Sequence, residues 1–384
     1  MSVTVTYVGS EGHFINVSKA MGSRNNELPE SMAGLAAYTV TGAACTGTAC
    51  TAPLLGLSFT PAALAEAQTL GFTPPNPYSS ASNYYTSNKI YQYYQNFPQY
   101  SGVSDTTSFV GNENWNALEV SVRERPAAGL NFMVNYTWSK SIDDLGTFRV
   151  GDNTHLDRSL SAASQPQNLV GTAVYQLPLG RNHKWGDNFA YRSVVSDWQI
   201  SGIGLYHSGL PILPIGTGCG GSGILNQCMP SIVAGQAVRQ NSYGKTASGA
   251  KVSWDSNSPN YIGSVQYLNP AAFTINVATG GTGQALNVGS GTALYVPGNA
   301  GRVAPLSGMW GQPSFNVDLA LKRTFSLYRS FKLAFEADMS NVTNHVVYKV
   351  PSATVAAGTN ATFGTITGIQ NNPRQAQLSG RISW

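Results

Sequence analysis

Apolar and polar residues alternate along several segments of this chain, and the alternation is clearest at its C-terminal end. Ala376, Leu378, Gly380, Ile382 and Trp384 occupy every second position, and a polar residue stands before each of them. A repeat of two is the period of a β-strand with one apolar and one polar face. The pattern predicts a terminal strand that continues to the last residue.

The same alternation recurs in several earlier segments. Short turns at residues 126–129 and 326–330 separate two pairs of these segments, which is typical of antiparallel hairpins. We therefore predict an all-β chain with about eight long antiparallel strands. The other alternating segments are 3–7, 118–122, 130–138, 169–177, 198–206, 315–321 and 331–339.

The aromatic residues of these segments favour a membrane barrel over a soluble sandwich. Phe325, Phe331 and Trp384 mark one end of the predicted strands, and Trp138 and Tyr206 mark the other. Aromatic girdles of this kind flank the lipid-facing band of a transmembrane β-barrel, whereas the outward face of a soluble sandwich is polar. We expect an antiparallel transmembrane β-barrel. Its polar lumen would be lined by Asn131, Asn135, Thr137, Glu119, Arg123, Lys332, Glu336, Gln375 and Arg381.

The connections between the predicted strands differ in length, and this difference predicts the two sides of the membrane. Three long segments, at about 9–113, 140–165 and 209–312, contrast with the short turns. Outer-membrane barrels have short periplasmic turns and long extracellular loops. We therefore expect the long segments outside the cell and Trp384 on the periplasmic side, with residues 1–384 forming one partial barrel domain.

Composition agrees with a membrane-embedded surface. Only 10% of the residues are charged, whereas soluble domains average roughly 25%. The net charge of +4 is dispersed, so we expect no nucleic-acid partner. The charge-free stretches 31–65 and 256–301 are interrupted by prolines and rich in Thr, Ser and Gly, so neither predicts a membrane-spanning helix. A short surface helix is predicted between the N-cap Thr60, followed by Pro61, and a stop at Gly71.

The four cysteines form two close pairs within loops rich in Gly, Ser and Thr. Cys45 with Cys50, and Cys219 with Cys228, are predicted to close small disulfide loops in an oxidising compartment. Both pairs fall in the segments expected outside the cell. Four unrelated free thiols stay open as the alternative, because these spacings are loose patterns. Zinc is disfavoured because no histidine lies near either pair.

Motifs for catalysis or cofactor binding are weak in this sequence. The GxGxxG glycines at 216–221 bracket a cysteine, and no helix is expected after them. The five histidines are scattered and accompany no metal or nucleophile motif. The acidic loop with Asp143, Asp144, Asp152 and Asp157 offers oxygen ligands for Ca²⁺, but a solvated loop is the simpler interpretation. We expect a protein that is not an enzyme and has no cofactor or metal.

Five short sequences carry a family resemblance, and they occur in one order along nearly the whole chain. Together they resemble the C-terminal barrel of Oar-like TonB-dependent outer-membrane proteins. Trp384 stands where that family usually has Phe, which keeps the aromatic chemistry. The five are NYTWSKSIDD at 135–144, DRSLSAASQPQNLVGTAVYQLPLG at 157–180, NVDLALKRTF at 316–325, FEADMSNVTNH at 335–345, and the closing residues from FGTITG to NPRQAQLSGRISW.

The resemblance implies that the chain is a wall and loop portion of a 22-stranded transporter or receptor barrel. Family members also carry a signal peptide, commonly a carboxypeptidase-regulatory-like domain, and a plug that contacts TonB. The residues after Met1 match none of these, so we expect the chain to be transport-incompetent on its own.

The resemblance also implies a location in the bacterial outer membrane and a set of partners. These are outer-membrane lipid, an unidentified extracellular ligand, and TonB where a plug precedes the barrel. The assembly machinery of the outer membrane is expected to recognise the terminal strand through Leu378, Ile382 and Trp384.

Two alternatives stay open. Eight strands can close on themselves into a barrel filled by side chains, which would suit a structural or adhesive surface protein. A secreted all-β adhesin that never enters a membrane would also show alternating strands.

Overall fold

The structure of the chain is a computed structural model, and its described part covers most of the predicted strands. All statements below concern this part. It comprises residues 1–17, 39–41, 51–54, 60–71, 90–95, 97, 109–127, 129–145, 158–180, 185, 192–213, 215–217, 231–240, 245, 248–254, 256–274, 276–279, 282–285, 309–327, 330–356 and 362–384.

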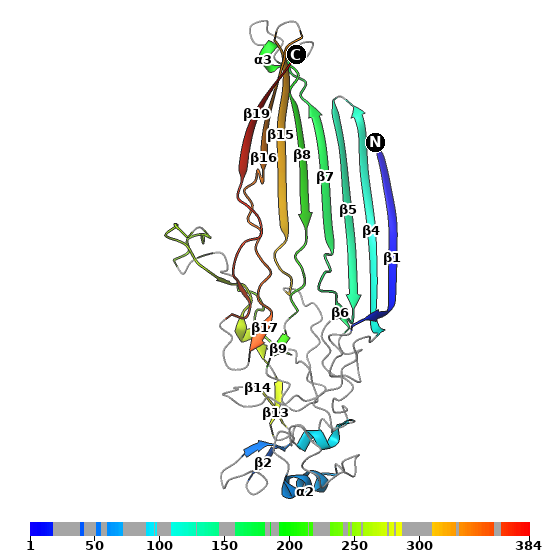
Figure 1. Cartoon of the computed structure of the whole chain (residues 1–384), viewed down its shortest axis with the longest axis vertical. Coiled ribbons are helices and arrows are strands. Elements are labelled where there is room, and N and C mark those ends of the chain that lie inside the picture. Colours follow the sequence, from blue (N-terminus) through cyan, green and yellow to red (C-terminus); the bar gives the residue numbers. More distant parts are fainter. Residues whose placement is uncertain are drawn as a thin grey trace.

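The main element is an antiparallel sheet in which eight long strands lie side by side in chain order (Figure 1). A short strand, β6 (Ser159–Leu160), pairs with the end of β5. The prediction of about eight long antiparallel strands is confirmed. In sheet order the long strands are β1 (Ser2–Asn16), β4 (Phe109–Ala127), β5 (Leu130–Asp143), β7 (Gln167–Gln176), β8 (Gln199–His207), β15 (Ser314–Ser326), β16 (Lys332–Ser340) and β19 (Gln375–Ser383).

The sheet has two open edges. Strand β1 pairs only with β4, and β19 pairs only with β16, among the residues that the structure describes. No hydrogen-bonded ladder joins β1 to β19 in this part of the chain. The eight strands therefore form an open sheet within the described part of the chain.

Residues that lie opposite one another across the strands form rows of like chemistry. Successive side chains of a strand point to opposite faces, so adjacent rows belong to opposite faces of the sheet. One row consists of Val5, Val120, Tyr136, Leu169, Tyr206 and Phe315. The adjacent row consists of Thr6, Glu119, Thr137, Asn168, His207 and Ser314. We call the two sides of the sheet the apolar face and the polar face.

The strands are longer than the alternation predicted at one end of the sheet. Strand β1 continues past Gly9 to Asn16, β4 begins at Phe109, and β5 continues to Asp143. The expected loop limits of about 9–113 and 140–165 were therefore wrong at their margins. The alternation of large apolar residues stops after Tyr7, but backbone pairing does not depend on side-chain polarity, so the ladder continues beyond it.

The opposite end of the sheet carries short turns. Gly129, in the β4–β5 turn, has φ +80°, and a Cβ there would lie 3.0 Å from the carbonyl oxygen of Gln176, so this position requires glycine. The β15–β16 turn is closed by the amide of Leu327, which donates to the carbonyl of Phe331 at 3.0 Å. The C-terminus lies at this same end (Figure 1). Following the side expected from the lengths of the connections, we call this the periplasmic end of the sheet and the opposite one the extracellular end.

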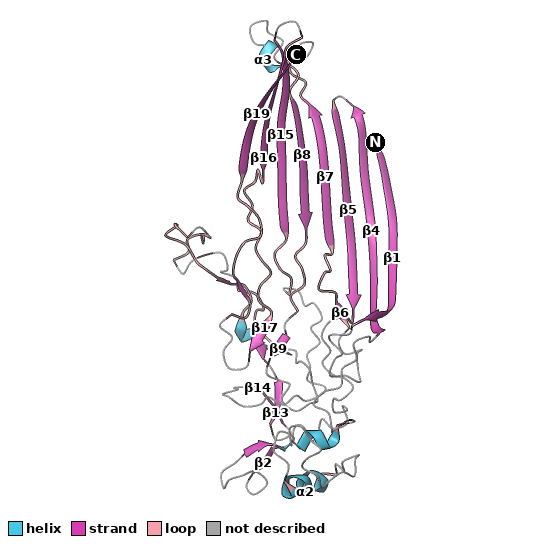
Figure 2. Cartoon of the chain, in the orientation of Figure 1, coloured by secondary structure: helices cyan, strands magenta, loops and turns pink. Residues whose placement is uncertain are grey.

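Helices lie beyond the two ends of the sheet (Figure 2). Helix α2 (Pro61–Thr69) begins as predicted, because the Thr60 hydroxyl oxygen accepts the amide of Ala63 at 3.1 Å. It stops before Gly71, which has φ +87°. Among the described residues, no helix has both the length and the apolarity to cross a bilayer. The other helical turns are η5 (Ile90–Tyr94), α3 (Arg192–Val195) and η7 (Pro270–Ala272).

Two tyrosines of η5 are almost fully buried in the first long connection. Tyr93 and Tyr94 are each 1% exposed. Burial raises the pKa of Tyr94 to about 12, because the charged phenolate would lose its hydration. The Tyr94 hydroxyl therefore stays neutral at physiological pH.

The segment expected as a loop at 209–312 contains packed structure in its described residues, and it shares a core with the β16–β19 connection. The amide of Tyr267 donates to the carbonyl of Gly364 at 2.8 Å, and the Gln266 side chain donates to the carbonyl of Phe363 at 2.6 Å. Gly364 has φ +70°, and a Cβ there would lie 2.5 Å from Leu268. We call this cluster the loop core. It consists of Ile212, Tyr267, Leu268, Ala272, Phe273, Met309, Phe363 and Ile366.

Short strand pairs link the segments around the loop core. Strand β9 (Ile215–Thr217) pairs in parallel with β17 (Thr354–Ala356), and β11 (Val265–Gln266) pairs with β18 (Thr365–Ile366). The remaining short strands form three further pairs, and both strands of each pair belong to the same connection. These are β2 (Thr39–Thr41) with β3 (Thr51–Pro53), β10 (Ser231–Ile232) with β12 (Phe273–Thr274), and β13 (Asn276–Thr279) with β14 (Thr282–Ala285).

The two faces predict opposite responses to a new charge on one strand. Leu319 lies on the apolar face of β15, and its neighbour Ala320 lies on the polar face. Leu319→Arg should lower the free energy of unfolding by about 2–4 kcal/mol, because the guanidinium would face lipid. Ala320→Arg should cost far less. Urea titration of protein folded into lipid vesicles measures both values, and equal costs would contradict the assignment of the faces.

Candidate functional site

The apolar face is a large uncovered surface. Val5 is 62% exposed and Leu378 is 72% exposed, although each belongs to a row of apolar side chains. Soluble proteins rarely expose a contiguous apolar surface that runs across several strands, and such a surface marks an interaction site. The face therefore requires an apolar partner along its length.

The polar face carries the side chains that the sequence assigned to a lumen. Lys322 and Glu336 form an ion pair on it at 3.4 Å. The register confirms that the predicted lumen residues share this face. They are Asn131, Asn135, Thr137, Glu119, Arg123, Lys332, Glu336, Gln375 and Arg381.

Apolar side chains interrupt the polar face at its centre. Met133 on β5, Val174 on β7, and Ile203 and Leu205 on β8 point to this side and are each more than one-third exposed. This patch has no distinct signal in the sequence, because Met133 and Val174 lie within local apolar runs and Ile203 lies between two glycines. The polar face therefore carries both polar and apolar side chains near the middle of strands β5, β7 and β8.

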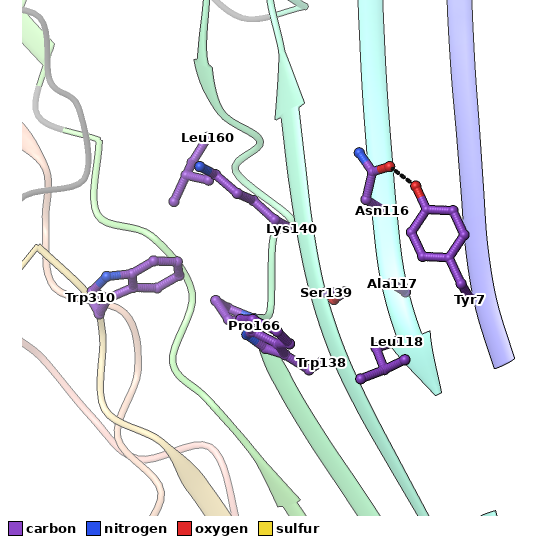
Figure 3. A pocket seen from close by; sticks show the side chains of 10 residues that line it. All are labelled: Tyr7, Asn116, Ala117, Leu118, Trp138, Ser139, Lys140, Leu160, Pro166 and Trp310. Carbon is purple, nitrogen blue, oxygen red and sulfur yellow. Dashed lines mark hydrogen bonds between the residues drawn. The ribbon is translucent and has the colours of Figure 1, made fainter. Parts of the chain in front are cut away.

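A groove of about 550 Å³ lies at the extracellular end of the sheet (Figure 3). Its size falls within the range of small-molecule pockets. Most of its lining is apolar and aromatic, with an amide and an ammonium at one side. The principal lining residues are Tyr7, Leu118, Trp138, Leu160 and Trp310, together with Asn116 and Lys140.

The register places the groove on the apolar face. Tyr7, Leu118 and Trp138 lie opposite one another on β1, β4 and β5, and they belong to the same face as the apolar rows. Two residues further along, Asn116 lies opposite Lys140. The Tyr7 hydroxyl donates to the side-chain oxygen (Oδ1) of Asn116 at 2.5 Å. The groove therefore marks the boundary between apolar and polar rows.

Asparagines hold the β16–β19 connection at the extracellular end. Asn341 is 5% exposed, and its amide group donates to the carbonyls of His345 and Asn372, both at 3.0 Å. Its side-chain oxygen accepts the amide of His345 at 2.9 Å. The backbone amide of Asn341 donates to the Asp318 carboxylate at 2.8 Å. Every polar group of the Asn341 side chain is therefore used.

The second part of this arrangement comes from the other end of the connection. Asn371 accepts the amide of Val347 at 2.8 Å and donates to the carbonyl of His345 at 2.7 Å. Asn344 accepts the amide of Arg374 at 3.0 Å. We call Asn341, Asn344 and Asn371 the asparagine clip. It explains the segment NVTNH as a structural motif that fixes where β19 begins.

A family model described as outer membrane beta barrel domain matches residues 1–377. The chain belongs to this family. The protein is therefore an all-β barrel protein of the bacterial outer membrane, and the partner of its apolar face is outer-membrane lipid. Searches of curated proteins and of solved structures found no match. The interpretation as a secreted adhesin outside any membrane is wrong, because the family places the protein in the outer membrane.

Arg323 is a charged side chain on the apolar face of this barrel wall, near the end with the short turns. The Arg323 guanidinium lies 4.1 Å from the ring centroid of Phe325 and 5.7 Å from that of Trp198, and it donates to the carbonyl of Val194. Aromatic faces stabilise such a cation, and the short α3 segment covers it near the periplasmic end. Nothing local in the sequence distinguishes Arg323 from a lumen-facing arginine, so its environment could not be predicted.

The remaining candidate residues of the sequence analysis have different outcomes. Cys45, Cys50, Cys219 and Cys228 lie outside the described residues, so both disulfides stay predictions. Leu378, Ile382 and Trp384 lie along the outer edge of the sheet, and Trp384 is 85% exposed.

The acidic loop is described only at its beginning. Asp144 is buried and accepts the backbone and side-chain amides of Asn112, so it braces β4 against the end of β5. Asp152 and Asp157 lie outside the described residues. Across the described positions, no group of three or more His, Cys, Asp or Glu side chains is placed to hold a metal ion.

The asparagine clip predicts a large stability effect at one residue. Asn341→Ala should lower the free energy of unfolding by about 2–3 kcal/mol, because it leaves buried partners without hydrogen bonds. Asn341 has φ +47°, so Asn341→Gly should cost roughly 1 kcal/mol less than Asn341→Ala. Urea unfolding in vesicles measures both, with the exposed neighbour Ser340→Ala as the control. Equal values for Asn341→Ala and Ser340→Ala would contradict the clip.

Proposed function

We propose that the chain is a wall and loop portion of a TonB-dependent, Oar-like outer-membrane receptor or transporter. The observation that supports this proposal best is the open sheet, in which β1 and β19 each have one neighbour among the described strands. Within a bilayer, unpaired backbone N–H and C=O groups cost several kcal/mol each. Strands beyond these eight would satisfy both edges in a wider barrel.

The other features support the same proposal. The polar face offers Lys322, Glu336 and Arg381 to a lumen, and an eight-stranded barrel has an interior only wide enough for its own side chains. The packed loop core gives the extracellular end a defined surface for an unidentified ligand. In this proposal the ligand is captured outside and passes through the lumen, with energy supplied through TonB where a plug accompanies the barrel. The proposal assigns the chain no catalytic step.

Cross-linking of the two edges tests the width of the barrel. With the native cysteines replaced by Ser, Thr4→Cys on β1 is combined in turn with Gln377→Cys, Ser379→Cys and Arg381→Cys on β19. We expect no intrachain disulfide between these edges in protein oxidised within native outer membranes. The positive control combines Ser379→Cys with Glu336→Cys, its direct neighbour on β16. A β1–β19 disulfide would contradict the wider barrel and favour a self-closed one.

The coupling to TonB is tested separately. The complete gene product from native outer membranes is passed over immobilised TonB, and we expect it to be retained. If it is not retained while the edges stay free of cross-links, the chain is a wide barrel wall that works without TonB.

We also propose that the terminal strand is the segment recognised by the outer-membrane assembly machinery. Phe331 and Trp384 are both exposed aromatic residues, and they lie at the same end of the sheet because their neighbours Lys332 and Ser383 pair with each other. Trp384→Ala and Phe331→Ala remove an interfacial ring of similar worth. Trp384→Ala should selectively reduce the amount of protein in the outer membrane, with degradation in the periplasm. Equal amounts of both variants in outer-membrane fractions would show that Trp384 acts only as an interfacial residue.

A further inference from the structure

The groove at the extracellular end of the sheet combines features that together point to a ligand. It lies where the apolar rows of β1, β4 and β5 give way to polar ones. Tyr7 is 69% exposed and Trp138 is 59% exposed, so the described part of the chain leaves both rings largely uncovered. Both residues belong to the face that contacts lipid. The groove is therefore continuous with the lipid-facing surface and is open to molecules within the membrane.

The backbone creates the shape of this groove. Gly9 follows Tyr7 on the same face of β1, and a Cβ at Gly9 would lie 3.2 Å from the Tyr7 hydroxyl oxygen. A larger side chain at this position would therefore push against the ring. The Tyr7 hydroxyl is hydrogen-bonded to Asn116, and the apolar part of the Tyr7 ring lines the groove together with Leu118 and Trp138 (Figure 3).

A cation stands at the polar side of the groove. Lys140 follows Trp138 on the same face of β5, and its side chain extends away from Trp138 (Figure 3). Within the described residues Lys140 takes part in no ion pair. A long basic side chain just beyond an aromatic girdle reaches the level of lipid headgroups, where anionic phosphates are attracted to it.

We propose that this groove is a binding site for one anionic lipid of the outer leaflet. An acyl chain occupies the apolar part between Tyr7 and Trp138, and the phosphate of the headgroup pairs with Lys140. The site fixes a lipid against the outer ends of β1, β4 and β5. This inference rests on the membership of the outer-membrane barrel family and is independent of TonB coupling.

Lipid retention by the complete gene product, purified from native outer membranes, tests the site. The protein in detergent is mixed with phosphatidylglycerol or phosphatidylcholine of identical acyl chains, and retained lipid is measured by native mass spectrometry. Wild-type protein should retain phosphatidylglycerol about fivefold more strongly, as expected for one interfacial lysine. Lys140→Gln should abolish this preference, and Lys140→Arg should keep it. Lys332→Gln, a neutralisation on the polar face, should leave it unchanged.

The apolar part of the site has its own matched pair of variants. Trp138→Ala should lower the retention of both lipids by about tenfold. Trp185→Ala, which removes an exposed ring elsewhere, should not. Heat-modifiable mobility on gels confirms that each variant is folded. Equal retention of the two lipids by wild type, a preserved preference in Lys140→Gln, or unchanged retention in Trp138→Ala would each overturn the proposal.

Discussion

The pairing of backbone hydrogen bonds across neighbouring strands is the constraint on which the rest of this structure depends. Inside a bilayer no water is present to satisfy a peptide group, so each N–H and C=O must find its partner within the protein. The ladders from β1 to β19 meet this requirement for every interior strand. Among the eight long strands of the described part, the outward sides of the two edge strands do not meet it. The backbone thus requires either further strands or closure, whatever the side chains are.

The hydrogen-bonded ladder fixes the register, and the register determines which side chains lie on each face of the sheet. The apolar face meets lipid, and the polar face meets whatever fills the barrel. The exceptions show how strict each requirement is. Arg323 is tolerated on the apolar face only with aromatic rings and a backbone carbonyl around its guanidinium. The polar face carries Met133 and Ile203, which are each more than one-third exposed, and exposed apolar side chains of this kind are common on protein surfaces.

The alternation of apolar and polar residues was sufficient to predict the strands and the chemistry of their two faces. The eight long strands, their two faces and the short turns follow from alternation, and the cap of α2 follows from Thr60 and Pro61. The groove was not predicted, because it depends on which residues of three strands lie opposite one another. Only the register supplies that information. Asn341 and Asn344 lie within a segment that carries the family resemblance, but the hydrogen bonds of the asparagine clip join both ends of a connection and leave no periodic signal.

The loop core escaped prediction for a related reason, and it has a consequence for how such proteins diversify. Gln266 and Phe363, which its hydrogen bonds join, are 97 positions apart. Phe363 and Ile366 come from one connection, and the other members come from another. Neither connection can be exchanged alone between related barrels, because the core residues of the remaining connection would then lose their packing partners. New specificity at this end must arise by joint replacement of both connections, or by changes confined to side chains outside the shared core.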